Sequence, residues 1–176
     1  MVVVKRNFPD LVAHAEQIVV GTAIAIQDVE DQSGVPSTLV TFSDLSVLKG
    51  DVGSDLTLRF AGGSSGRYVV EVPDMPTFTL GERAVLFVAG NGRDICPLVG
   101  VWQGRFRVRL DASQGTEVVE SGEGKSVVGL TGHELRFAEP PGQGEGSGAA
   151  LPMPLDTFRQ LIADELASPQ QEPASR

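Results

Sequence analysis

The sequence is poor in the residues that build disulfide scaffolds and metal sites. Of 176 residues, one is a cysteine, Cys96, and two are histidines, His14 and His133. A lone cysteine cannot form an internal disulfide, which excludes a disulfide-stapled scaffold and a cysteine-rich zinc site. A chain of this length can bury a core without either device. We expect Cys96 to be a small buried apolar residue, because Ile95 and Pro97 flank it.

Motifs of catalysis and of cofactor binding are also missing. The sequence has no G-x-S-x-G, no pair of histidines at helical spacing and no calcium loop of the EF-hand type. Gly62–Gly66 lacks the lysine that follows a phosphate-binding loop, and Gly142–Gly148 opens no strand-to-helix unit. Asp28, Glu30 and Asp31 are interpreted as a solvated loop rather than a calcium site. We therefore expect no enzyme, no metal and no cofactor.

Long apolar runs and a basic charge balance are absent as well. No run of about 18 apolar residues occurs, so no transmembrane helix is predicted. The chain has 14 Lys and Arg against 23 Asp and Glu, for a net charge of −9. Binding to nucleic acid or to anionic membranes requires a basic face that releases counterions. We expect neither nucleic acid nor membrane insertion.

Short apolar runs separated by glycine and proline make up most of the chain. There are 21 glycines and 11 prolines. Alternation of apolar and polar residues is typical of strands buried on one face. The strands are predicted at 2–4, 17–27, 38–48, 55–60, 68–72, 83–89, 95–101 and 105–110, with shorter ones at 115–120 and 126–130. This pattern predicts a mainly β, antiparallel barrel or sandwich.

Two positions in the predicted strands indicate bends. Gly21 lies inside strand 17–27, where a glycine favours a bulge or a tight bend. In strand 38–48 the apolar residues change from one face to the other near Ser43 and Asp44. A β-bulge would reconcile the two halves of that strand.

The two ends of the chain carry helical signals. Asn7 is a predicted N-cap for a brief helix that ends by about Glu16, with Pro9 in its first turn. Residues 155–167 form a predicted amphipathic helix, with Leu155, Phe158, Ile162 and Leu166 on one stripe.

The composition divides the chain into four predicted parts. Residues 1–138 form the β-barrel domain and 139–154 a flexible linker rich in proline and glycine. The helix at 155–167 is expected to be an appendage on that linker. The polar tail 168–176 is predicted to be disordered.

A row of arginines is the main candidate for a binding surface. Arg105, Arg107 and Arg109 alternate with apolar residues that should face inward, so the three cations should share the outer face of one strand. Trp102 precedes the row, and tryptophan is enriched at interaction hot spots. These four residues are predicted to contact a partner that carries carboxylates, or a sugar acid. Two alternatives are a charged edge strand that blocks aggregation and ion pairing within the chain.

Several segments resemble a known group of proteins. They are 11–22 (LVAHAEQIVVGT), 41–50 (TFSDLSVLKG), Gly62-Gly63, the phenylalanine, glycine and glutamate pattern of 78–87, and 100–106 (GVWQGRF). Together they resemble uncharacterised bacterial exported β-barrel proteins that are similar to the netrin-like and tissue metalloprotease-inhibitor OB-type fold. The resemblance implies a partly closed OB-like barrel and export.

The resemblance supplies no active site. The inhibitor family holds the zinc of its target protease through an N-terminal cysteine and contains several disulfides. Here Cys96 stands alone and the sequence starts Met1-Val2-Val3, so inhibition by that mechanism is not expected.

The sequence thus predicts a non-catalytic binding module for a protein partner, in the bacterial envelope or outside the cell. Residues 1–7 do not form a signal peptide, so export would require a leader upstream of Val2, and a cytoplasmic location stays open. The alternatives are a structural or oligomerisation protein and, less favoured, a protease-inhibitor-like protein or a hydrolase.

Overall fold

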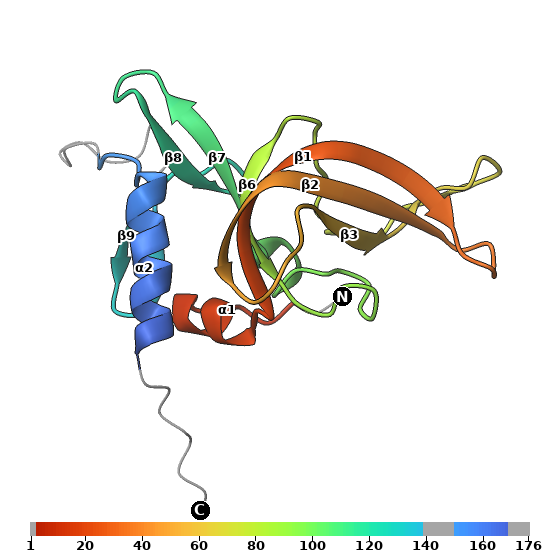
Figure 1. The fold of residues 1–176 in the computed structure, drawn as a ribbon, viewed down its shortest axis with the longest axis horizontal. Helices are drawn as coiled ribbons and strands as arrows, with labels where there is room; N and C mark the ends of the chain where they lie inside the picture. The colour runs from red at the N-terminus through yellow and green to blue at the C-terminus, as the bar shows by residue number, and fades with distance from the viewer. Residues whose placement is uncertain (1–2, 139–149, 169–176) are drawn as a thin grey trace, which may run out of the picture.

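The computed structural model describes residues 3–138 and 150–168. They form a mainly β fold with one short helix near each end of the described chain (Figure 1), which confirms the predicted fold class at this level. The elements are α1 (Phe8–His14), β1 (Gln17–Glu30), β2 (Pro36–Lys49), β3 (Leu56–Ala61), β4 (Gly63–Ser64), β5 (Val69–Val70), β6 (Arg83–Val88), the 3-10 helix η1 (Val101–Gly104), β7 (Arg105–Asp111), β8 (Thr116–Ser121), β9 (Val127–Thr131), β10 (Glu134–Phe137) and α2 (Leu155–Ala167).

The main sheet is antiparallel, with strand order β3-β2-β1-β6-β7-β8. Strand β1 pairs with β6 along Gln17–Thr22 and with β2 from Ile18 to Glu30. Its pairing with β2 shifts register between Val20 and Thr22, so Gly21 lies at a bulge. On the facing strand, Asp44 has a φ of 52°. Both predicted bends are therefore confirmed, and they curve the β1–β2 hairpin away from the rest of the sheet (Figure 1).

Helix α2 belongs to the core and is not an appendage. Its Phe158 is fully buried, and the ring centroid lies 5.0 Å from that of Phe106 and 5.9 Å from that of Phe8. The end of the predicted linker is also fixed to the sheet. The amide of Met153 donates to the carbonyl of Val127 at 2.7 Å, and the carbonyl of Met153 accepts from Val119 at 3.0 Å. The rest of the predicted linker, 139–149, and the tail from 169 lie outside the described residues.

The short N-terminal helix forms as predicted. The side chain of Asn7 accepts a hydrogen bond from the amide of Asp10, as an N-cap does. Phe8 and Leu11 are buried against α2 and the sheet, and they join the same core as Phe158. A second core cluster, around Phe42 and Phe60, lies under β1, β2 and β3.

Three predicted strands are wrong or shorter than expected. Residues 3 and 4 are not in a strand, and Val2 lies outside the described residues. Only Val69–Val70 of the predicted strand 68–72 is extended and paired. Residues 95–101 make a single bridge, from Leu98 to Val88, instead of a strand. Pro97 has no amide to donate there, and Gly100 has a positive φ of 63°, so a regular ladder cannot continue.

The irregular segment 91–99 nevertheless connects two strands. The Asn91 side chain accepts from the amide of Arg59 at 3.0 Å and donates to the carbonyl of Thr57 at 2.8 Å, as a neighbouring strand would. The carbonyl of Ile95 accepts from Ala61 in β3, while Val99 donates to the carbonyl of Phe87 in β6. Side chains and isolated backbone groups thus occupy the edge of β3.

Candidate binding cleft

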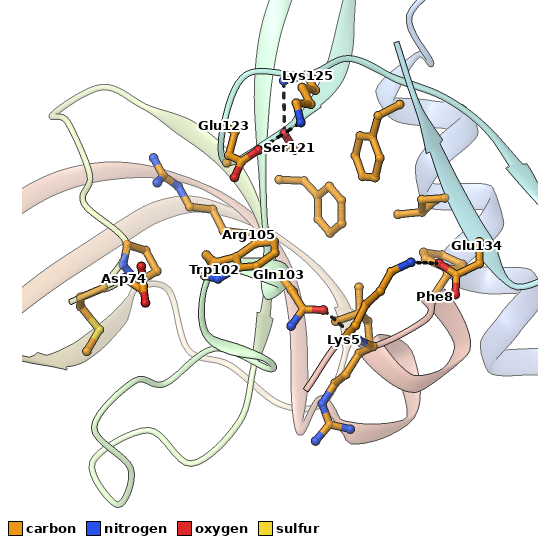
Figure 2. Close-up of a pocket in the computed structure, with 18 of the residues that line it drawn as sticks. Lys5, Phe8, Asp74, Trp102, Gln103, Arg105, Ser121, Glu123, Lys125 and Glu134 are labelled. Atoms are coloured by element: carbon orange, nitrogen blue, oxygen red, sulfur yellow. Dashed lines mark hydrogen bonds and ion pairs between the residues drawn. The ribbon is translucent and has the colours of Figure 1, made fainter. Parts of the chain in front are cut away.

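A cleft of about 610 Å³ opens beside the N-terminal end of β7. Of the predicted site residues, Trp102 and Arg105 line it, while Arg107 and Arg109 do not. Its apolar lining includes Phe8, Leu11, Phe106, Leu135 and Phe137. Figure 2 shows Trp102 near the centre of the view, with Asp74 on one side and the Lys5–Glu134 pair on the other. Of the three predicted arginines, only Arg105 therefore belongs to the cleft.

The position of Trp102 depends on a close backbone contact, where Gly104 packs against the backbone of Val99 and Phe87. This contact is called the Gly104 crossing. Trp102 lies in η1, directly after two residues with positive φ, and 46% of the tryptophan is exposed. A Cβ on Gly104 would lie 2.7 Å from the carbonyl oxygen of Val99 and 3.0 Å from that of Phe87. Only glycine therefore allows this turn to pack on β6 without moving backbone. The crossing places Trp102 and Arg105 on the same side of the cleft.

Arg105 is buried, in contrast to its predicted exposure. Its Nε donates to Glu82 Oε1 at 3.1 Å, its Nη2 contacts the same oxygen, and both side chains are about 10% exposed. The guanidinium carbon lies 4.4 Å from the centroid of the Phe78 ring. Because Phe78 and Glu82 cover this face of β7, Arg105 stabilises the wall of the cleft and is not a free cation.

The other two arginines lie beyond the cleft. Arg109 pairs with Glu120, and its Nη1 lies 3.8 Å from Asp111 Oδ2. Hydrogen bonds from Ser113 lower the pKa of the Asp111 carboxyl, and the charge of Arg109 lowers it further. Arg107 lies opposite Glu120 in the β7–β8 register and is exposed.

Leu110, predicted to face inward, is 68% exposed. Val108 is the last residue of β7 that pairs with β6, where its partner is Arg83, so only β8 accompanies Leu110. In Figure 1 the β7–β8 hairpin projects from the body of the protein, which explains this exposure.

Gln103 fixes the N-terminal segment at the cleft. Its side-chain oxygen accepts from the amide of Arg6 at 2.8 Å, and its amide group donates to the carbonyl of Val4 at 3.0 Å. The Gln103 side chain thus bonds to the backbone of Val4 and Arg6 as a neighbouring strand would, although these residues lie almost a hundred positions earlier in the chain. No local pattern in the sequence signals such a contact, so the contribution of Lys5 and Arg6 to the cleft was not predicted.

The rim of the cleft carries charges of both signs. Lys5 lies 3.3 Å from Glu134, and Lys125 lies 3.4 Å from Glu123; all four side chains are at least half exposed. The lining contains Lys5, Arg6, Arg105 and Lys125 against Asp74, Glu123 and Glu134, a positive excess of one on a chain of net charge −9. An apolar floor with a polar, partly ion-paired rim has the anatomy of a protein interface.

Comparisons with known proteins give no information on function, so the interpretation depends on the cleft. No family model, curated protein or solved structure matches the chain. Within residues 3–138 and 150–168, no cluster of three metal-ligating side chains is present, and no helix there is long and apolar enough to cross a membrane. His14 and His133 are both exposed.

Cys96 lies outside the cleft and should be chemically inert. It is 6% exposed, and burial raises the pKa of its thiol from 9.0 to about 11, with a further increase from Asp94. Only the thiolate reacts with iodoacetamide, so a rise of about two pKa units should slow alkylation of the folded protein about 100-fold. Mass spectrometry of folded and urea-unfolded protein measures the two rates, and equal rates would show that Cys96 is accessible in the folded state.

Proposed function

We propose that this chain is a non-catalytic binding module, and that its cleft receives an apolar side chain of a protein partner. The exposed indole of Trp102, beside an apolar cleft and held by the Gly104 crossing, is the observation that carries the proposal. Isolated exposed apolar residues are common on proteins. Tryptophan beside a preformed pocket is the typical anchor of an interaction hot spot.

The charged rim gives the proposed site its selectivity. Lys5 and Lys125 can exchange their exposed carboxylate partners, Glu134 and Glu123, for carboxylates of a bound chain at little cost, because exposed ion pairs contribute only about 0–1 kcal/mol. Arg105 acts by holding the wall of the cleft. A contact of the partner with Arg107 and Arg109 would be peripheral to this cleft.

An OB-like, partly closed barrel is the finer fold that we propose. Three features support it: the pairing of β1 on both sides, the bends at Gly21 and Asp44, and the segment 91–99 that bonds to both β3 and β6. A place in the bacterial envelope or outside the cell rests on the sequence resemblance. Fractionation of cells that express the native protein tests this location.

A photo-crosslinking residue at position 102 tests the proposed cleft directly. In cells that express the protein natively, Trp102 replaced by the crosslinker should capture one discrete partner. The same residue at Leu110, which is more exposed than Trp102 but lies outside the cleft, should not. Equal capture at both positions would contradict the cleft, and a crosslink to a second copy would favour the oligomerisation alternative.

The captured partner then allows a quantitative test. Because Trp102 is the only tryptophan, its emission reports occupancy of the cleft, and we expect a blue shift on binding. Trp102→Ala should weaken binding about 30-fold or more, the range of a hot-spot residue. Leu110→Ala should leave the affinity unchanged, and an unchanged affinity for Trp102→Ala would refute the proposal.

A further inference from the structure

A second surface with binding potential lies along the outer edge of β1. Strand β1 pairs with β6 only as far as Thr22, and the backbone of Ala23 bonds to Gly81 and Glu82. From Ile24 to Glu30, its only strand partner among the described residues is β2. Figure 1 shows this part of the β1–β2 hairpin extending beyond β6. Within the described part of the chain, one edge of β1, the open edge, therefore has no strand partner along these seven residues. The Asp28 side chain contacts β4, where it accepts a hydrogen bond from the amide of Ser64 at 2.9 Å.

The pairing pattern identifies the backbone groups on that edge. At the hairpin end, the amide of Asp31 donates to the carbonyl of Val35 at 3.1 Å, and Pro36, which has no amide hydrogen, lies opposite Glu30. Hydrogen-bonded and non-bonded pairs alternate along antiparallel strands. The amides and carbonyls of Ile26, Asp28 and Glu30 therefore point away from β2, toward the open edge.

A cavity of about 710 Å³ adjoins this edge. Ile26, Val40 and Phe60 line it from one face of β1, β2 and β3, and Met75 and Phe78 line it from the covering segment. Ile26 is 39% exposed, whereas Val40 and Phe60 are buried. A strand added beside β1 would direct every second side chain to this face, so its apolar residues would reach the cavity.

The residues around the open edge are mostly acidic, which favours a basic ligand. Asp28, Glu30 and Asp31 lie along or at the end of the open edge, and Glu71 lines the cavity. Arg67, on the β4–β5 turn, is a basic residue in the same region. A second copy of the chain would bring two acidic edges together, which is unfavourable. A segment with lysine or arginine at its ends would instead be attracted.

We infer that the open edge of β1 binds an extended, basic peptide segment by strand addition, with alternate apolar side chains of the segment in the adjoining cavity. Main-chain hydrogen bonds to Ile26, Asp28 and Glu30 would supply affinity, and the cavity would supply sequence preference. This site is separate from the proposed cleft at Trp102 and does not depend on it.

A synthetic peptide tests the inference. The probe is a fluorescent seven-residue peptide, KVTVTVK, in which valine alternates with threonine between two lysines. We expect a rise in anisotropy with the full chain, slower amide exchange at Ile26, Asp28 and Glu30, and no binding when proline replaces the central valine. Replacing both lysines with glutamate should weaken binding about tenfold or more. An absence of binding at about 1 mM peptide would overturn the inference.

Matched variants of the protein locate the peptide. Ile26→Arg should weaken binding about tenfold or more by placing a cation at the cavity. The double variant Glu30→Lys with Glu71→Lys should do the same through exposed positions that do not threaten folding. Leu110→Arg and Trp102→Ala should bind as the unchanged protein does. Binding that is lost with Trp102→Ala but kept with Ile26→Arg would overturn the inference, as would a dimer in sedimentation that Ile26→Arg dissolves.

Discussion

Replacing Phe158 with alanine should lower the free energy of unfolding by about 3–5 kcal/mol, the usual cost of removing a buried aromatic ring. Phe158 is fully buried, and its ring meets those of Phe8, Phe87 and Phe106 at centroid distances of 5.9, 6.5 and 5.0 Å. The cavity left behind would lie between both helices and the sheet. Urea denaturation followed by circular dichroism measures the loss.

Leu166→Ala on the same helix is the matched control. Leu166 is 39% exposed, so its truncation should cost well under half as much as that of Phe158. A detached helix would instead unfold without affecting the sheet, and both variants would then leave the main transition unchanged. That outcome would contradict the packing of α2 in the core.

Replacing Glu82 with leucine should destabilise the protein by about 3–5 kcal/mol, because it leaves the buried charge of Arg105 without its partner. Both side chains are about 10% exposed, and Glu82 also accepts from the amide of Thr79 at 3.2 Å. In a double variant, Arg105→Met should recover most of the loss, since no buried charge then remains. Denaturation of the two single variants and the double variant completes the cycle and gives the coupling energy.

The exposed pair Lys125–Glu123 provides the reference for this experiment. Its side chains are more than half exposed, so Glu123→Leu should change stability by about 0–1 kcal/mol. A similar small effect for Glu82→Leu would mean that water reaches Arg105, and the wall of the cleft would then be less rigid than its contacts indicate.

Local patterns in the sequence were sufficient for most elements of the fold. Asn7 could be identified as an N-cap, and Phe158 and Ile162 as the apolar stripe of a helix, because capping and periodicity involve neighbouring residues. The bends at Gly21 and Asp44 were equally visible, as a glycine in a strand and a change of apolar face. Each of these signals depends on the chain within a few positions.

Most of the errors concern contacts between distant segments. The alternation of apolar and charged residues in 105–110 predicts an exposed side chain for Arg105. In the fold, Phe78 and Glu82 cover that side chain. Segment 95–101 is apolar enough for a strand, but Pro97 and the glycines around it prevent regular pairing. Of the cleft, Trp102 could be found from its residue type, while Gln103 and Lys5 act through partners far away in the sequence.

The contact between α1 and α2 has a consequence for biosynthesis. Phe8 and Phe158 meet in the core although 150 positions separate them, so the apolar surface of α1 that packs on α2 stays uncovered until α2 is made. While Leu155–Ala167 is still inside the ribosome, the sides of Phe8, Phe87 and Phe106 that pack on Phe158 are uncovered. Contacts of such long range also slow folding. The core is therefore completed only after Leu155–Ala167 has left the ribosome.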